Sequence, residues 1–390
     1  MPRSIYLDHA SSMPLRPAAR AAMLEALDAV GDPHRPHRDG REARRLLERA
    51  RERVAAVLAA QPEEIVFTSG GTESVGLALL GAARANRDGG TRAVTTAVEH
   101  ASVLGAGQRL RDDGFEVAEV GVDEHGRADL DRFLAEVSRP GTILASVQHA
   151  NNEVGTMQPL AEAARLARQH GALIHTDACQ TTGRLPVDVG ALGVDLLSLS
   201  GHKFGGPPGA GALYVRRGVD LAPVLGGDDR ERGLRPGREN LPAIVGMAAA
   251  LEAAAAELAE EAGRLWALTD RLRAGLEERV EGVQVHGHPT QRVPHIVCWS
   301  VLGLDAEPLL MALDERGFRL DAGSTCTGEA QEPSHVLAAM GRVTTGSLRA
   351  SVGPGNTEAD VDALLEALPE VVGGLRQVAS TTAKTNGDGG

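Results

Sequence analysis

The sequence predicts an α/β protein in which a mostly parallel seven-stranded sheet lies between helices, followed by a smaller α+β C-terminal domain. Short apolar runs alternate with amphipathic helical segments up to residue 215, which is typical of parallel strands joined by helices. After a long Ala/Glu/Leu-rich segment the order of elements changes. The length of 390 residues suits about two to three domains.

The large domain is expected at 16–250, after an N-terminal arm at 1–15 that joins the small domain. Two amphipathic helices open it, at 16–29 and 40–60, around a proline-rich loop that cannot be helical. The expected strands are 64–68, 92–96, 116–121, 142–147, 172–175, 195–199 and 211–215. The expected helices between them are 73–85, 102–112, 130–137 and 160–170. Ligands of such sheets bind at the carboxyl ends of the strands.

The small domain is expected at 251–374, after a glycine-rich stretch at 226–237 and one long helix at 241–280. Its further elements are a strand at 295–301, helices at 307–316 and 334–340, a strand at 347–352 and a helix at 358–371. Residues 375–390 end in a polar run and are expected to form a disordered tail.

The composition argues against several classes of function. The chain has 53 acidic residues against 40 Lys plus Arg and a formal charge of −13, which argues against direct binding of nucleic acid or an anionic membrane. No apolar run approaches the roughly 20 residues of a membrane span and no leader peptide is visible, so a cytoplasmic protein is expected. Cys179, Cys298 and Cys326 are too few and too scattered for a disulfide framework or a zinc site, and no metal is expected.

Lysine is nearly absent from the sequence. Only Lys203 and Lys384 occur, and Lys384 lies in the predicted tail. Arginine serves surface charge equally well, but its pKa is too high for it to form a Schiff base. Lys203 therefore indicates a chemical role for its amine, unless it is one lysine retained by chance.

Two further clusters follow predicted strands. Ser69-Gly70-Gly71-Thr72-Glu73 places a glycine turn before a helix, whose free N–H groups suit a phosphate, although Thr72 could equally be an N-cap. Ser200-Gly201-His202-Lys203 brings hydroxyl and imidazole donors beside the amine. Asp177, at another strand end, could hold a protonated ring nitrogen, cap a helix or bind a metal. Together, a phosphate cradle, a lysine and this carboxylate indicate a pyridoxal 5'-phosphate site.

At these residues the chain resembles the cysteine desulfurases, fold type I PLP-dependent transferases of the class V aminotransferase superfamily. The resemblance extends to about residue 372. The matching segments, in order, are Tyr6 to Ala10, Phe67 to Ser74, Glu99-His100, His149 to Gly155, Asp177 to Gln180, Ser200 to Lys203, Glu231 to Gly237, Gly323 to Cys326 and Ser347 to Arg349.

The resemblance implies a role for each cofactor residue. Lys203 is the lysine that bonds the cofactor, Asp177 pairs with its ring nitrogen, and His100 stacks on its ring. Asn152 and Gln180 hydrogen-bond the cofactor or substrate near the phenolic oxygen. The residues that would hold the phosphate are Gly71, Thr72, Ser200 and His202.

The resemblance also implies how substrate is handled. Arg349 grips the carboxylate of L-cysteine with its planar guanidinium, and Cys326 is the sulfur-accepting nucleophile. Cys298 lies in the strand expected at 295–301 and is interpreted as a thiol of the hydrophobic core. Cys179 is interpreted as a residue that serves packing. Lys203 acts as the base that moves the Cα proton.

The sequence departs from the family at Arg238, where a threonine usually reaches the phosphate of the partner subunit. If the protein is a homodimer of that kind, Arg238 would approach the phosphate held across the interface; alternatively it faces solvent or pairs with Glu239 or Asp228-Asp229. Asp32 replaces a usual Asn and Thr325 a usual Ala.

The predicted function is therefore that of a cysteine desulfurase, which converts L-cysteine to L-alanine and leaves a persulfide on Cys326 for a sulfur-acceptor protein, a scaffold or a sulfur carrier. The acceptor pathway would be iron–sulfur assembly, tRNA thiolation or a specialised sulfur incorporation. Two alternatives remain open: a selenocysteine or cystine lyase of the same fold, and a sulfur-relay partner active only with its acceptor.

Overall fold

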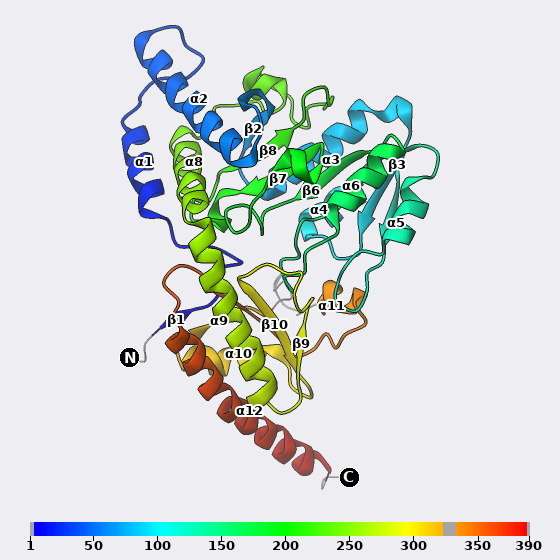
Figure 1. The fold of residues 1–390 in the computed structure, drawn as a ribbon, viewed down its shortest axis with the longest axis vertical. Coiled ribbons are helices and arrows are strands. Elements are labelled where there is room, and N and C mark those ends of the chain that lie inside the picture. The colour runs from blue at the N-terminus through cyan, green and yellow to red at the C-terminus, as the bar shows by residue number, and fades with distance from the viewer. Residues whose placement is uncertain (1–3, 323–332, 388–390) are drawn as a thin grey trace.

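The computed structural model describes residues 4–322 and 333–387, with side chains up to residue 379 (Figure 1). Its largest sheet has seven strands in the order β2-β8-β7-β6-β5-β3-β4. Only β8 runs antiparallel to its neighbours, so the prediction of a mostly parallel seven-stranded sheet is confirmed. The strands are β2 (Ile65–Thr68), β3 (Arg92–Thr96), β4 (Glu116–Val120), β5 (Thr142–Ser146), β6 (Leu173–Asp177), β7 (Leu196–Ser200) and β8 (Gly211–Val215).

Helices cover both faces of this sheet. Neighbouring strand residues such as Val66 and Phe67 enter different hydrophobic clusters, because successive side chains of a strand point to opposite faces. One face carries α3 (Gly71–Ala85) and α4 (Ala101–Asp112). The other carries α1 (Pro17–Leu27), α2 (Arg38–Leu58), α5 (Leu130–Val137), α6 (Leu160–Gln169), the short α7 (Val189–Leu192) and α8 (Leu241–Ala256).

The prediction of a single helix at 241–280 is wrong. The structure has α8 and then α9 (Leu258–Arg279), bent by 73° at Glu257. The bend arises because the two helices belong to different cores: Leu251 of α8 packs with the large sheet, and Leu265 of α9 packs with the small domain. The two hydrophobic clusters therefore lie on either side of the bend at Glu257, where Arg16 pairs with Glu257 at 2.6 Å.

The small domain is built on an antiparallel sheet in the order β12-β10-β9. The N-terminal arm joins it, since β1 (Ile5–Tyr6) pairs in parallel with β11 (Phe318–Arg319). The sequence reading missed β1, β9 and β11, which are short or only partly buried. The remaining elements are β9 (Val283–His286), β10 (Ile296–Val301), β12 (Ser347–Ser351), α10 (Ala306–Glu315), α11 (His335–Ala339) and α12 (Glu358–Gly387).

Helix α12 corrects the expected disordered tail, because it continues to Gly387. Val372 belongs to the small-domain core and Leu375 packs against it, so the helix is anchored past residue 371, where it was expected to end. In the parts of the chain described, no single helix is long and apolar enough to cross a membrane; only α8 and α9 taken together reach that length and composition.

Candidate active site

The carboxyl ends of β6 and β7 meet the first turn of α3, as the sequence predicts for a ligand site. Strand β6 ends at Asp177 and β7 at Ser200, followed by the turn η3 (Gly201–Lys203). A Cβ on Gly71 would lie 2.8 Å from Sγ of Cys179, and a Cβ on Gly70 would lie 3.6 Å from Oγ of Ser200. The backbone of this turn is therefore brought against both strand ends, with no room for a side chain at position 71.

The first turn of α3 is suited to an anion. Gly70 is the N-cap and provides no side-chain acceptor, so the alternative that Thr72 caps the helix is wrong. Glu73 accepts a hydrogen bond from the backbone N–H of Ser69 at 2.7 Å. Thr72 is exposed at the helix start. The terminal N–H groups keep the positive end of the helix dipole available.

Ser200 and His202 complete this cradle. The Ser200 hydroxyl and Nδ1 of His202 are hydrogen-bonded at 3.0 Å. Burial, together with the nearby Lys203 charge, lowers the pKa of His202 to about 4, so its ring is neutral near pH 7. The Ser200 hydroxyl and the neutral His202 ring can therefore donate hydrogen bonds to a ligand without adding a fixed charge to the site.

Lys203 is held by the N-terminal arm. Its Nζ donates to the backbone oxygens of Ala10 at 2.8 Å and Ser11 at 3.0 Å. Burial lowers its pKa below the usual lysine value. Asp177 is 9% exposed, and its Oδ1 accepts from the N–H of Cys179 at 2.9 Å.

His100 is the N-cap of α4. Its Nδ1 accepts from the N–H of Ser102 at 3.1 Å, which leaves the proton of the neutral ring on Nε2. Burial lowers its pKa, although the charge of Asp177 acts in the opposite direction. The ring is therefore a neutral, oriented imidazole.

Gln180 is already oriented by two partners. Its Nε2 donates to the Ala10 oxygen at 3.0 Å, and its Oε1 accepts from Nε2 of His295 at 3.2 Å. The sequence reading missed His295, which is fully buried at the start of β10 and belongs to no motif. A histidine directly before a buried strand was the only available signal.

Arg349 lies on β12 and joins the small domain to the arm. Its Nη1 donates to the backbone oxygen of Asn152 at 2.8 Å. Its Nη2 donates to Oδ1 of Asp8 at 2.9 Å and to Oγ of Ser11 at 2.8 Å. Oδ2 of Asp321 lies 2.5 Å from the same Nη2. The sequence reading assigned no role to Asp8, Ser11 or Asp321.

Arg238 is exposed and donates to the backbone oxygen of Gly31 at 3.3 Å. Of the acidic partners considered for it, Glu239 pairs with Arg230 instead, at 2.8 Å, and Arg230 pairs with Asp32 at 2.9 Å. Arg230 also pairs with Asp228 at 3.1 Å.

Two of the three cysteines are described. Burial raises the pKa of Cys179 and of Cys298 well above the usual thiol value, so both thiols stay protonated. Cys326 lies outside the described residues. Within residues 4–322 and 333–387, no group of three or more His, Cys, Asp or Glu side chains could hold a metal ion.

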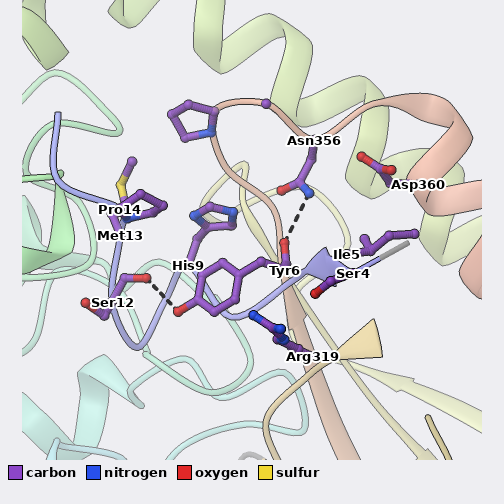
Figure 2. A pocket seen from close by; sticks show the side chains of 12 residues that line it. Ser4, Ile5, Tyr6, His9, Ser12, Met13, Pro14, Arg319, Asn356 and Asp360 are labelled. Atoms are coloured by element: carbon purple, nitrogen blue, oxygen red, sulfur yellow. Dashed lines mark hydrogen bonds between the residues drawn. The ribbon is translucent and has the colours of Figure 1, made fainter. Parts of the chain in front are cut away.

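The N-terminal arm also lines a cavity of about 580 Å³ (Figure 2). Tyr6, His9 and Ser12 line that cavity together with Arg319 and Asn356. Three other residues of the arm, Asp8, Ala10 and Ser11, contact Arg349 or Lys203. Residues of the arm therefore line this cavity and also hold the side chains of Lys203 and Arg349.

Comparison with known proteins gives consistent results. The Aminotransferase class-V family model matches residues 5–364. A cysteine desulfurase IscS of Methanosarcina thermophila is 42% identical over 386 residues, which are 98% of this chain and 95% of that protein.

Solved structures agree with the curated relatives. A NifS-like protein superposes with a TM-score of 0.88 at 34% identity and covers 95% of this chain and 100% of its own. A structure described as SspA in complex with cysteine has a TM-score of 0.78 at 30% identity and covers 90% of this chain and 99% of its own.

Proposed function

The chain belongs to the cysteine desulfurases of the class V aminotransferase family, and we propose that it converts L-cysteine to L-alanine at the carboxyl ends of β6 and β7 while Cys326 accepts the sulfur. Enzymes of this family depend on pyridoxal 5'-phosphate. The observation that carries the proposal is the convergence of Lys203, Asp177 and the first turn of α3 at one edge of the sheet.

The described residues fit this cofactor. Gly71 has no side chain that could cover the N–H groups of the first helix turn, and such groups suit a phosphate. Thr72, Ser200 and His202 add polar groups to this turn. Asp177 is a buried carboxylate suited to a protonated ring nitrogen. Lys203 supplies the amine, and His100 and Gln180 are oriented before any ligand binds.

The bound cofactor supplies an electron sink for the carbon that carries the substrate amino group. Asp177 would maintain that capacity through its negative charge. Lys203 can take up and return the Cα proton, and burial favours this by lowering its pKa below the usual lysine value. His100 presents Nε2–H as a donor from a ring that remains neutral.

Arg349 would bind the carboxylate of L-cysteine, since its guanidinium lies beside the arm that holds Lys203. A relative with a cysteine complex is similar to this chain over 90% of its length, which supports this choice of substrate. Asn152 reaches Arg349 through its backbone oxygen, so its side-chain amide remains a candidate contact for cofactor or substrate.

Cys326 is assigned as the sulfur acceptor because the other two thiols are unsuitable. Cys298 is buried and Cys179 is half-buried, both have raised pKa values, and a thiolate is the required nucleophile. In the overall exchange the Cys326 thiolate bonds to the substrate sulfur and the carbon–sulfur bond breaks. The electron pair of the broken carbon–sulfur bond stays on the carbon, which takes up a proton. The products are therefore alanine and a persulfide on Cys326.

The protein is also proposed to act as a homodimer that passes the persulfide sulfur to an acceptor protein. Arg238 is exposed and its side chain makes one hydrogen bond, to a backbone oxygen, in the part of the chain described. A charged guanidinium there could replace the threonine that serves the partner's phosphate in related enzymes.

The test is turnover of L-cysteine by the holoenzyme, with alanine and persulfide measured together. Cys326→Ala should keep the cofactor and bind cysteine yet form neither product at a useful rate, while Cys298→Ser should stay active. If Cys326→Ala turned over selenocysteine or cystine at the wild-type rate, a lyase would be the correct assignment. Turnover seen only with an added acceptor protein would favour the sulfur relay.

A further inference from the structure

We infer that Asp321 is a specificity-determining residue, a carboxylate of the chain itself that occupies the substrate-carboxylate position on Arg349 and must be displaced when L-cysteine binds. The inference rests on the proposed function, in which Arg349 receives the carboxylate of the substrate. It concerns a side chain for which neither the sequence reading nor the proposed mechanism has a role.

The contacts of Arg349 single out Asp321. The two hydrogens of Nη2 are used by Oδ1 of Asp8 at 2.9 Å and Oγ of Ser11 at 2.8 Å. Oδ2 of Asp321 lies 2.5 Å from Nη2 but makes an ion pair without hydrogen-bond geometry. Asp321 thus pairs with Arg349 through charge without a hydrogen bond to it, whereas Asp8 and Ser11 are hydrogen-bonded to the same nitrogen.

The charges on Arg349 favour replacement of one carboxylate over addition of a third. Asp8 and Asp321 together carry two negative charges against the single charge of Arg349. A third carboxylate at this guanidinium would be repelled by both, and the positive charges of Lys203 and Arg319, which act in the same region, would offset part of that repulsion. Replacing one of the two carboxylates keeps the charge of Arg349 for the substrate. The side chain of Asp8 is 22% exposed and is hydrogen-bonded to Nη2 of Arg349. The side chain of Asp321 is 32% exposed and makes no hydrogen bond to that nitrogen.

The exchange needs only a side-chain rotation. The backbone of Asp321 pairs with that of Arg349, with N–H to O distances of 2.7 and 3.2 Å, so the chain at this point is fixed. Oδ1 of Asp321 accepts from the N–H of Ala322 at 2.8 Å, which offers the carboxylate an anchor away from the guanidinium. Nε of Arg349 is buried without a partner among the described residues and is a further donor for an incoming carboxylate.

The experiment compares Asp321→Asn and Asp321→Ala with the wild-type holoenzyme. Removing the competing charge should lower the KM for L-cysteine about tenfold, the scale of one charged contact, with little change in kcat. The dissociation constant of the product L-alanine, read from the visible absorption of the holoenzyme, should fall by a similar factor. Asp314→Asn removes the same charge from an exposed position on α10 and should change neither value.

Cysteamine provides the decisive control, because it has the amine and thiol of cysteine but no carboxylate. Its binding should not improve in either Asp321 variant. An unchanged or raised KM for L-cysteine, or an equal gain for cysteamine, would overturn the inference. If the wild-type holoenzyme produced no alanine from L-cysteine, the proposed function would fail instead. Melting temperatures of both variants, read in parallel, identify any loss of folding.

Discussion

Lys203 and Gln180 donate hydrogen bonds to the same backbone oxygen, that of Ala10, at 2.8 and 3.0 Å. His295 fixes the amide of Gln180 from behind, so the donor end of the amide faces the arm and the acceptor end faces the small domain. The position of the Lys203 amine is therefore set jointly by residues of the arm, the large domain and the small domain.

Lys203→Ala should abolish both activity and the visible absorption of the bound cofactor. The sequence has one other lysine, Lys384, which lies in α12 of the small domain. The absorption spectrum after dialysis checks this, with Arg217→Ala as an exposed control that should keep the chromophore. A Lys203→Ala protein that retained the chromophore would disprove the assignment.

Asp177→Asn should reduce kcat by roughly a hundredfold to a thousandfold, on the scale of about 3 kcal/mol for a lost charge contact in a transition state. The asparagine oxygen can still accept from the N–H of Cys179, so folding should be preserved while the charge is lost. Steady-state kinetics with unchanged melting temperature would be the expected pattern. Near-normal turnover would mean that another acid faces the ring nitrogen.

Arg238→Ala should loosen cofactor binding and link cofactor loss to dissociation of the dimer. The side chain is exposed and its hydrogen bond is to the Gly31 carbonyl, so its removal should cost the fold of one subunit little. Cofactor release and molecular mass are measured together over a dilution series. Unchanged affinity in an intact dimer would show that this arginine is incidental.

Arg51→Met should destabilise the protein by about 3–5 kcal/mol, the cost of leaving one member of a buried ion pair alone. Arg51 donates to both carboxylate oxygens of Glu231, which is 6% exposed and also accepts from the N–H of Phe67. Urea unfolding gives the value. The Arg51→Met, Glu231→Gln double variant should recover most of the loss, since the buried charge is gone and an acceptor for Phe67 remains.

Glu153 should make stability depend on pH. Burial raises its pKa from 4.5 to about 7, although Ser334 donates to its carboxylate at 2.5 Å. Because the raised pKa favours the protonated form in the folded state, this contribution to stability is complete below pH 4.5 and is lost as the pH rises through about 7. Urea unfolding across this range should show a shallower decline for Glu153→Gln. Equal slopes in the two proteins would contradict the prediction.

The sequence predicted the parts of the molecule that depend on local pattern. Alternating apolar runs located every strand of the large sheet, and the ends of those strands located Asp177, Ser200 and Lys203, because parallel strands bring their carboxyl ends to one edge. The segment 241–280 is uniformly rich in helix formers, so nothing local marks the bend at Glu257, which follows from packing on two cores.

His295 and Asp321 illustrate a second limit of sequence reading. Neither belongs to a motif, and each acquires its partner from a distant part of the chain: Gln180 for His295, and the side chain of Arg349 for Asp321. A polar residue beside a buried strand is usually read as a packing or surface residue. Only the tertiary structure shows which donor or acceptor it meets.

The arm that holds Lys203 also has a consequence for biosynthesis. Asp8 and Arg349 are 341 residues apart in the chain yet contact each other at 2.9 Å, and Ile5 pairs with Phe318. During translation the large domain can fold as a unit while the small domain is still being made. Arg349 leaves the ribosome late, so the arm waits for its final neighbours through most of synthesis. We therefore expect nascent chains stalled before residue 318 to remain unable to retain the cofactor, even with Lys203 and the large sheet already complete.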